Sequence, residues 1–128
     1  MDCNTIRKTD KNVAVIILAA GLGMRMESRK AKVLHELHGR PMVMYVVETA
    51  EKCVKDNIVL VIGNQAETVR KIVSKHSRAS FAIQDAPLGT GDAVLSALPY
   101  LSDDIEQVVI LCGDVPLITA DTVLGLIN

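Results

Sequence analysis

Residues 13–32, VAVIILAAGLGMRMESRKAK, establish the fold class, because an unbroken apolar run is followed at once by small and basic residues. The run covers residues 13–18, and its β-branched content without polar alternation predicts a central strand that is buried on both faces. The alanines and glycines after it leave room for backbone N–H groups to approach and surround an anion. The segment therefore predicts a strand that ends in an anion-binding loop.

Basic side chains follow this loop at four positions, Arg25, Arg29, Lys30 and Lys32. Together with the loop N–H groups, they predict a polyphosphate as the ligand. We assign Arg25 and Lys32 to the ligand, and we expect Arg29 and Lys30 to be solvated surface charges. A Walker loop is excluded because G-x-x-x-x-G-K-[ST] does not occur. The dinucleotide fingerprint is excluded because Met26 stands where its third glycine is needed.

The composition limits the possible functions. A chain of 128 residues is long enough for one domain with a true core. Its net charge of -1 argues against a nucleic-acid binder, and aromatic residues at 2% leave few stacking platforms for single strands. No apolar run approaches the roughly 20 residues of a spanning helix, so we expect no membrane partner.

The cysteines predict the cellular location of the protein, and the polar N-terminal residues predict where its nucleotide-binding part begins. The three cysteines, Cys3, Cys53 and Cys112, lack C-x-x-C spacing, which predicts reduced thiols in a cytoplasmic protein. Residues 1–12 are polar and are predicted to be a disordered tail, with the nucleotide-binding part over residues 13–128.

Hydrophobic periodicity alternates between strand and helix along the chain. Strands are expected at residues 13–18, 58–62, 80–83 and 107–112, and helices at residues 42–55, 66–76 and 92–98 and after residue 119. Pro41 suits the first turn of the helix at 42–55, Thr119 is the expected N-cap of the last helix, and Asp121 falls in the first turn of that helix. The alternation predicts an α/β fold, with a doubly wound, mainly parallel sheet. In such a sheet, ligands bind at the carboxyl ends of the strands.

Several motifs resemble those of the sugar nucleotidyltransferases. Residues 18–26, LAAGLGMRM, with Ala31-Lys32 resemble L-x-A-G-x-G-[ST]-R-[ML] followed by P-K. Further blocks at residues 32–35, 37–42, 63–67, 84, 88–93 and 113–117 resemble the uridylyltransferase domain of the bacterial bifunctional N-acetylglucosamine-1-phosphate uridyltransferases. The resemblance implies a Rossmann-like nucleotidyltransferase (nucleotide-diphospho-sugar transferase) fold, of which this chain is the N-terminal part. It also implies a reaction of UTP with N-acetylglucosamine 1-phosphate, or a related sugar 1-phosphate, that yields a UDP-sugar and pyrophosphate.

The residues fit this chemistry, which needs positioning and charge neutralisation and no covalent nucleophile. Arg25 is expected to hold the departing β- and γ-phosphates through its planar fork, and Lys32 to neutralise the α-phosphate or the sugar phosphate. Asp114, beside Gly113 at a strand's end, is the expected Mg²⁺ ligand. In the resembled family this aspartate shares the ion with an asparagine that lies beyond residue 128.

Base recognition is assigned first to Gln84, whose amide can offer a donor and an acceptor to uracil. The other residues expected to contact the nucleotide are Leu18, Ala19, Ala20, Gly21, Gly23, Gly89, Thr90 and Gly113. Thr90 is also an expected N-cap for a helix over residues 91–98.

Three departures from the family pattern leave alternatives open. Met24 replaces a hydroxyl residue, Ala31 replaces a proline, and Pro87 stands where the family has a second glutamine. One alternative is a cytidylyl- or guanylyltransferase of the same fold, and the other is a non-catalytic nucleotide-binding module. Neither the sugar acceptor nor the oligomeric state is specified by the sequence.

Overall fold

A computed structural model describes residues 12–20, 36–54, 57–63, 66–84, 89–113, 115 and 117–127 of the chain. The predicted tail lies outside this described part, except for Asn12, whose carbonyl accepts hydrogen bonds from Glu106 N at 2.8 Å and Gln107 N at 3.3 Å.

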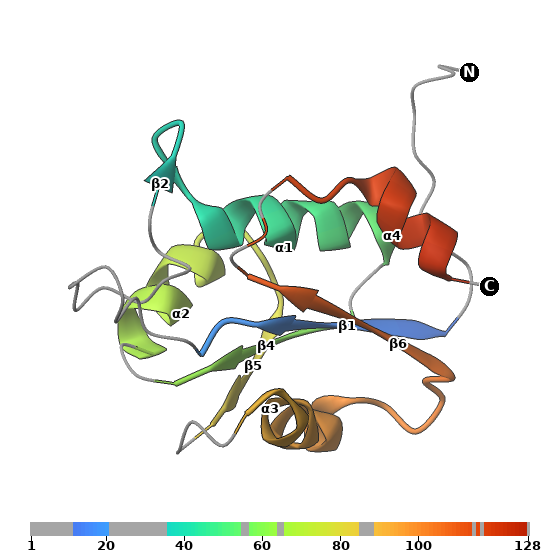
Figure 1. Cartoon of the computed structure of the whole chain (residues 1–128). Coiled ribbons are helices and arrows are strands. Elements are labelled where there is room, and N and C mark those ends of the chain that lie inside the picture. The colour runs from blue at the N-terminus through green and yellow to red at the C-terminus, as the bar shows by residue number, and fades with distance from the viewer. Residues whose placement is uncertain are drawn as a thin grey trace.

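The architecture is a parallel sheet with helices on both faces (Figure 1). The four-stranded sheet has the order β5-β4-β1-β6. Its strands are β1 (Val13–Leu18), β4 (Ile58–Ile62), β5 (Ser80–Ile83) and β6 (Gln107–Cys112), and every neighbouring pair is parallel. These bounds match the predicted ranges, so the predicted α/β class is confirmed.

The helices divide between the two faces of the sheet. Helices α1 (Met42–Cys53), α2 (Ala66–Ser74) and α4 (Ala120–Leu126) contribute to the core on one face. Helix α3 (Thr90–Ala97) packs on the other face, as Figure 1 shows. This placement on both faces is the doubly wound arrangement that the alternating pattern predicts.

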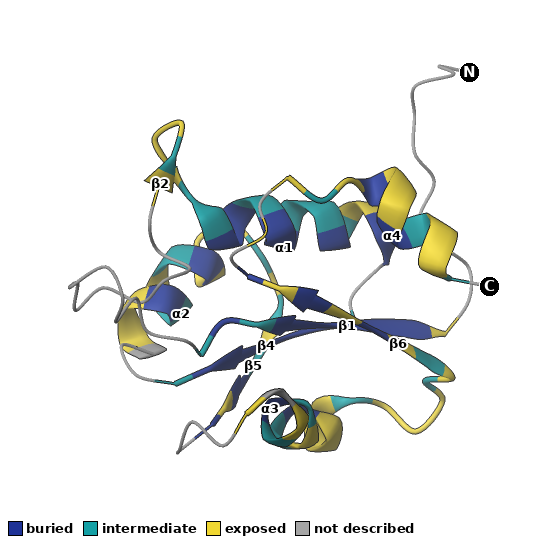
Figure 2. Cartoon of the chain, in the orientation of Figure 1, coloured by how far each residue is buried: buried dark blue, intermediate teal, exposed yellow. Residues whose placement is uncertain are grey.

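Strand β1 is buried on both sides because it lies between β4 and β6 and under helices on each face (Figure 2). Val13, Val15 and Ile17 belong to the core under α1 and α4, and Ile16 belongs to the core under α3. Each of these side chains contributes about 1.5–3 kcal/mol through removal from water. A strand in this position has no polar face, which explains the unbroken apolar run.

Strand β6 has a different environment, because it forms one edge of the sheet. Val109 and Leu111 point into the core under α1 and α4, whereas Val108 and Ile110 on the opposite face are 38% and 46% exposed. Its sequence is as apolar as that of a central strand, yet only one of its faces is covered by the described residues.

Helix α3 begins earlier than expected, and the prediction that Thr90 is its N-cap is wrong. The helix starts at Thr90 itself, with Gly89 in the N-cap position. The Gly89 carbonyl accepts the first intrahelical bond, from Ala93 N at 3.1 Å. A short 3₁₀ turn, η3 (Leu98–Tyr100), then continues the chain through Pro99. Helices α1 and α2 end two residues before the predicted positions, at Cys53 and Ser74.

The start of α4 agrees with the sequence. The Thr119 side chain accepts a hydrogen bond from Thr122 N at 3.2 Å, which confirms the predicted N-cap. Asp121 lies in the first turn, where the helix dipole favours a negative charge.

A two-stranded hairpin was not predicted. Strands β2 (Glu36–Leu37) and β3 (Arg40–Pro41) pair antiparallel around His38 and Gly39, whose φ angles are 54° and 80°. Positive φ at both central residues is the requirement of a tight hairpin turn, and glycine meets it without strain. In the sequence, only the His38-Gly39 pair between two short segments could have indicated this turn. Pro41 ends β3 and is the N-cap of α1, so it precedes the first turn in which we expected it.

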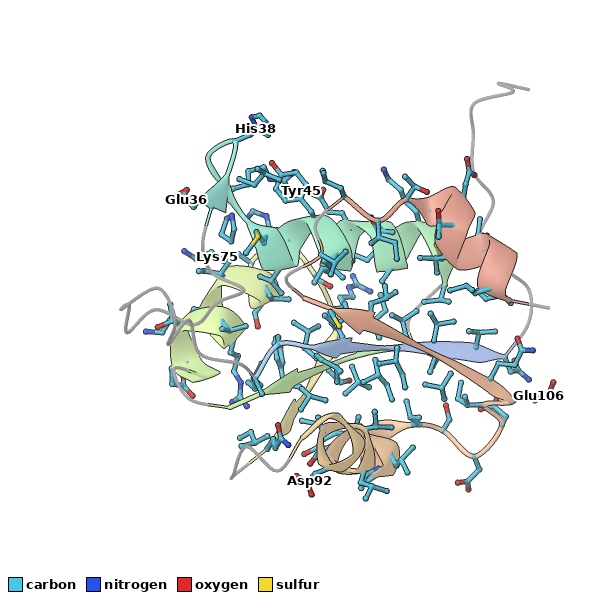
Figure 3. All side chains as sticks on the ribbon, in the orientation of Figure 1. Glu36, His38, Tyr45, Lys75, Asp92 and Glu106 are labelled. Carbon is cyan, nitrogen blue, oxygen red and sulfur yellow. The ribbon has the colours of Figure 1, made fainter. Side chains whose placement is uncertain are left out.

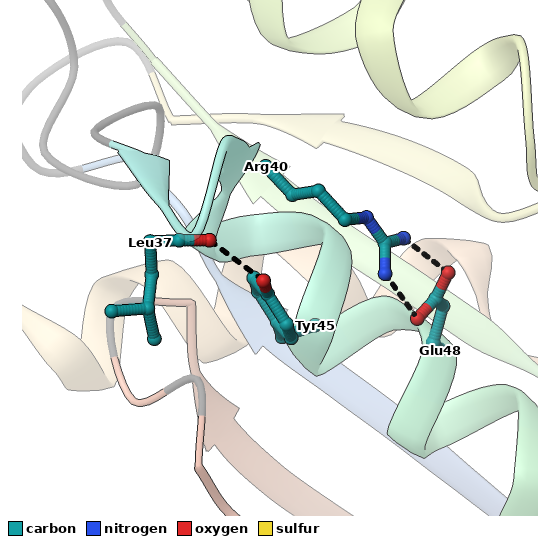
Figure 4. A network of polar contacts seen from close by, with 4 residues as sticks. All are labelled: Leu37, Arg40, Tyr45 and Glu48. Carbon is teal, nitrogen blue, oxygen red and sulfur yellow. Dashed lines mark hydrogen bonds and ion pairs between the residues drawn. The ribbon is translucent and has the colours of Figure 1, made fainter.

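Side chains of α1 hold this hairpin in place (Figure 4). The Tyr45 hydroxyl donates to Leu37 O at 2.6 Å, and both terminal nitrogens of Arg40 contact the Glu48 carboxylate. The Arg40 guanidinium also lies 5.1 Å from the centre of the Tyr45 ring. The hairpin is therefore fixed to α1 at both of its strands.

Two of the three cysteines lie in described parts of the chain. Cys53 is buried and its thiol contacts Ala120 O at 3.6 Å, whereas Cys112 is exposed at the end of β6. Among the described residues, no helix has the length and apolar character needed to cross a membrane.

The Arg40–Glu48 pair predicts a pH-dependent stability. The hydrogen bonds from Arg40 lower the pKa of Glu48, so the pair stabilises the fold above the ordinary glutamate pKa and this contribution is lost as the pH falls through the lowered value. Both side chains are nearly half exposed, so Glu48→Gln should reduce the free energy of unfolding by less than about 1 kcal/mol at pH 7. Urea denaturation at several pH values measures the difference, with Glu51→Gln on the same helix as control. A difference that persists in acid would contradict this assignment.

The cysteines should differ in reactivity. Burial raises the pKa of the Cys53 thiol and shields it, so alkylation by iodoacetamide should reach Cys112 first and Cys53 only when α1 and α4 separate. Mass spectrometry of a native time course measures the order, and the chain unfolded in urea is the control in which both react. Equal native rates would show that the α1–α4 contact opens readily.

Candidate functional site

The carboxyl ends of three strands meet at one edge of the sheet. Ala20 follows β1, Gly63 follows β4 and Gln84 follows β5. A methyl group added at Gly63 would lie 3.4 Å from both the Ala20 Cβ and the Gln84 carbonyl oxygen. Gly63 therefore lies within contact distance of both Ala20 and Gln84, at the edge where parallel sheets bind ligands.

Main-chain hydrogen bonds extend the sheet beyond the strand ends. Ala19 N donates to Val61 O at 2.8 Å, Gln84 N donates to Ile62 O at 2.8 Å, and Gly113 N donates to Leu18 O at 2.9 Å. The segments predicted to bind the ligand therefore begin from fixed positions.

The structure brings together five of the residues predicted to contact a nucleotide, namely Leu18, Ala19, Ala20, Gln84 and Gly113. Gly89 and the backbone of Thr90 lie at the start of α3, within reach of the Gln84 side chain. The other predicted residues, Gly21, Gly23, Arg25, Lys32 and Asp114, lie outside the described residues, and so does the side chain of Thr90. Their roles stay predictions.

Gln84 is the buried polar side chain of this edge, at 9% exposure. Its Nε2 atom donates to Gly89 O at 3.2 Å and to the Asp92 carboxylate at 3.0 Å. Burial of an amide is tolerated because its hydrogen bonds replace those with water. Asp92 was not predicted to take part in the site, since the sequence indicates only an acidic residue at the start of a helix.

Gly89 has a backbone conformation that side chains oppose, with φ 98° and ψ 176°. This region is populated almost only by glycine. Its carbonyl accepts from both Ala93 N and Gln84 Nε2, at 3.1 Å and 3.2 Å. The glycine therefore directs one oxygen so that it serves both the first turn of α3 and the Gln84 amide.

The hairpin fixes the far end of the predicted phosphate-binding segment. Residues 21–35, which include Arg25 and Lys32, run between Ala20 at the sheet edge and Glu36 in β2. Ala20 lies against Gly63, and Leu37 is held by Tyr45. Figure 3 labels Glu36 and His38 on the hairpin and Asp92 on the first turn of α3. Both flanks of the segment are thus anchored to the described core.

The described ranges contain no cluster of three or more His, Cys, Asp or Glu side chains suited to a metal ion. The predicted ligand, Asp114, lies outside those ranges, directly after Gly113, which is held at the sheet edge. An aspartate is a residue type that magnesium commonly takes as a protein ligand, with water and substrate phosphates completing its shell.

A comparison with protein families decides the family. The sequence pattern of the MobA-like NTP transferase domain matches residues 15–128. This chain belongs to that family. The membership agrees with the sheet, its strand order and the resemblance in the motifs.

Curated relatives include the bifunctional protein GlmU of Geobacter metallireducens, which is 47% identical over 117 residues. That match covers 91% of this chain and 25% of the relative, so the chain spans about a quarter of the protein it matches. The similarity confirms the resemblance to the bifunctional uridyltransferases.

Solved structures share the fold at lower identity. Rv0371c of Mycobacterium tuberculosis in complex with manganese matches with a TM-score of 0.74 and 17% identity, over 91% of this chain and 58% of that one. The 4-diphosphocytidyl-2C-methyl-D-erythritol synthase of Anaerococcus prevotii matches with a TM-score of 0.73 and 23% identity, over 92% of this chain and 50% of that one. These likenesses confirm the predicted nucleotidyltransferase fold.

The backbone conformation of Gly89 predicts that replacing this glycine by alanine destabilises the fold. Gly89→Ala should lower the free energy of unfolding by about 1–3 kcal/mol, because a Cβ opposes this φ although space is open around it. Gly91→Ala, in the first turn of α3 and also with open space, should be neutral or stabilising by up to about 1 kcal/mol. Urea denaturation of both variants measures the contrast, and equal effects would contradict the assigned conformation.

Proposed function

We propose that this chain carries the nucleotide-binding part of a Mg²⁺-dependent uridylyltransferase that joins UTP and a sugar 1-phosphate, with N-acetylglucosamine 1-phosphate as the preferred acceptor. The products are a UDP-sugar and pyrophosphate. The observation that carries this proposal is that Gly63 lies against both Ala20 and Gln84 at the edge where parallel sheets bind ligands. The chain that forms this sheet belongs to the MobA-like NTP transferase family. The 47% identity to a GlmU protein favours uridylyl transfer among the reactions of this fold.

The reaction requires a phosphate oxygen of the sugar 1-phosphate to attack the α-phosphorus of UTP while the bond to pyrophosphate breaks. The loop after β1 would bind the triphosphate through its N–H groups. Arg25 would hold the β- and γ-phosphates, and Lys32 would neutralise the α-phosphate or the incoming phosphate. These contacts oppose the charge that gathers on the leaving group, which is the main catalytic contribution in such transfers.

Asp114 would hold the metal ion, with Gly113 fixing the backbone beside it through the bond to Leu18 O. A bound divalent cation neutralises phosphate charge and aligns the triphosphate with the attacking oxygen. The manganese bound to Rv0371c supports a divalent ion in this fold. The cytoplasmic location predicted from the cysteines is part of the same proposal.

A cytidylyltransferase is the second candidate. Pro87 replaces a glutamine of the uridylyltransferase pattern. In addition, the structural neighbour from Anaerococcus prevotii is named as a synthase of a diphosphocytidyl compound. A guanylyltransferase and a non-catalytic nucleotide-binding module complete the alternatives. Met24 and Ala31 favour the module, because both depart from the family pattern within the phosphate loop.

Titration calorimetry with UTP, CTP and GTP, each with and without Mg²⁺, tests nucleotide binding without requiring turnover. UTP should bind best and more tightly with Mg²⁺. Arg25→Ala and Lys32→Ala should each lower the affinity for UTP by about tenfold to a hundredfold, which is the effect of removing a hydrogen bond to a charged group. Asp114→Asn should remove the benefit of Mg²⁺.

Arg29→Ala is the matched control, because this arginine is expected to be solvated and should leave UTP affinity unchanged. Preference for CTP or GTP would replace the proposed substrate with that of the alternative enzyme. Release of pyrophosphate when N-acetylglucosamine 1-phosphate is added with UTP would distinguish an enzyme, which releases it, from a binding module, which does not. Absence of binding by all three nucleotides would refute the proposal.

A further inference from the structure

The side-chain amide of Gln84 has one of its two polar atoms already engaged. Its Nε2 atom carries two hydrogens, and these meet Gly89 O at 3.2 Å and Asp92 Oδ2 at 3.0 Å. Among the described residues, none donates a hydrogen bond to Gln84 Oε1. The oxygen is therefore the atom of this amide that is left for a ligand. Gln84 can therefore offer a ligand an acceptor oxygen, because both of its N–H hydrogens are already engaged.

Asp92 determines which way this amide points. The Gly89 carbonyl and the Asp92 carboxylate are both acceptors, so a half-turn of the amide would set Gln84 Oε1 against two other oxygens. The half-turn would also break two hydrogen bonds, one of them to a charged group, in a side chain with 9% exposure. A single orientation of the amide follows, and the Asp92 carboxylate is the charged one of the two acceptors that hold it.

The partners of the amide belong to a helix that is packed against the sheet. Gly89 and Asp92 lie at the N-cap and in the first turn of α3, and Ala93 and Ala97 of the same helix are buried against the sheet. Gln84 is tied to β4 through its main chain, at 2.8 Å from Ile62 O. The orientation is therefore set by two elements that the core holds together.

We propose that Asp92 is a positioning residue that turns Gln84 Oε1 towards the bound nucleotide, and that this selects a pyrimidine with an N–H donor at that place. The inference rests on the proposed binding of a nucleotide at this sheet edge. Uracil carries a hydrogen on N3, which donates to an oxygen. Cytosine has an unprotonated N3 at the same position, so its lone pair would face that of Oε1. The oriented amide thus favours UTP over CTP, and Pro87 need not be a glutamine for the distinction to exist.

Calorimetry with UTP and CTP in the presence of Mg²⁺ tests this inference on Asp92→Asn, Asp92→Ala and the unchanged chain. The amide introduced by Asp92→Asn can present either an oxygen or a nitrogen, so only Gly89 O still favours the original orientation of the Gln84 amide. The turned amide, which offers its N–H groups to cytosine, then becomes accessible. The ratio of the dissociation constants for CTP and UTP should fall by about tenfold in both variants, the discrimination of one well-placed base contact. Asp103→Asn, which removes the same charge from an exposed loop, is the control and should keep the original ratio.

The ratio separates a positioning role from a structural one, because general damage to the site would weaken both nucleotides equally. An unchanged ratio in Asp92→Asn would overturn the inference while nucleotide binding stands, and so would a preference for CTP in the unchanged chain. Failure of the unchanged chain to bind either nucleotide would refute the proposed function itself. Solvent exchange of the Gln84 side-chain NH₂, followed by NMR, should be faster in Asp92→Ala. If that variant does not fold, Asp92→Asn of nearly equal shape carries the test.

Discussion

Burial of β1 on both faces governs the placement of every other element of the fold. The strand pairs with a parallel neighbour along each edge, and it buries Val13, Val15 and Ile17 in one core and Ile16 in the other. Helix α1 can cover one face and α3 the other only because this strand has no polar side. The carboxyl end of β1 is consequently fixed between those of β4 and β6, and the small residues after it start from the middle of the sheet edge.

The candidate site follows from how the chain leaves that edge. Three main-chain hydrogen bonds, from Ala19, Gln84 and Gly113, continue the sheet past the strand ends. Gly89 then adopts a conformation closed to other residues and turns its carbonyl towards the Gln84 amide. Small residues and glycines at this edge remove side chains from the space in which a ligand would contact the backbone. Among the described residues of this edge, the buried polar side chain is that of Gln84, and its amide donates to Gly89 O and to the Asp92 carboxylate.

Contacts outside the main core hold the segment that would carry the phosphate-binding cations. Hairpin β2–β3 is too short to be stable alone. It is held on α1 by Tyr45, whose hydroxyl binds Leu37 O, and by Arg40, which pairs with Glu48 and lies over the Tyr45 ring. The ion pair contributes little by itself because it is half exposed. Together these contacts fix the chain directly after the stretch that contains Arg25 and Lys32.

The amino-acid sequence was sufficient to predict the four strands of the parallel sheet, the four α-helices among the described residues and the α/β class, because apolar periodicity and burial obey the same geometry. It also indicated which strand ends carry small and polar residues, and thus where a ligand is expected to bind. The N-cap of α3, the hairpin turn at His38 and the exposed face of β6 depended on the tertiary structure, since φ angles and neighbours across the chain decide them. The pairing of Asp92 with Gln84 was likewise decided only by the fold. A carboxylate in the first turn of a helix has the same sequence signature whether it faces water or a buried amide eight residues earlier.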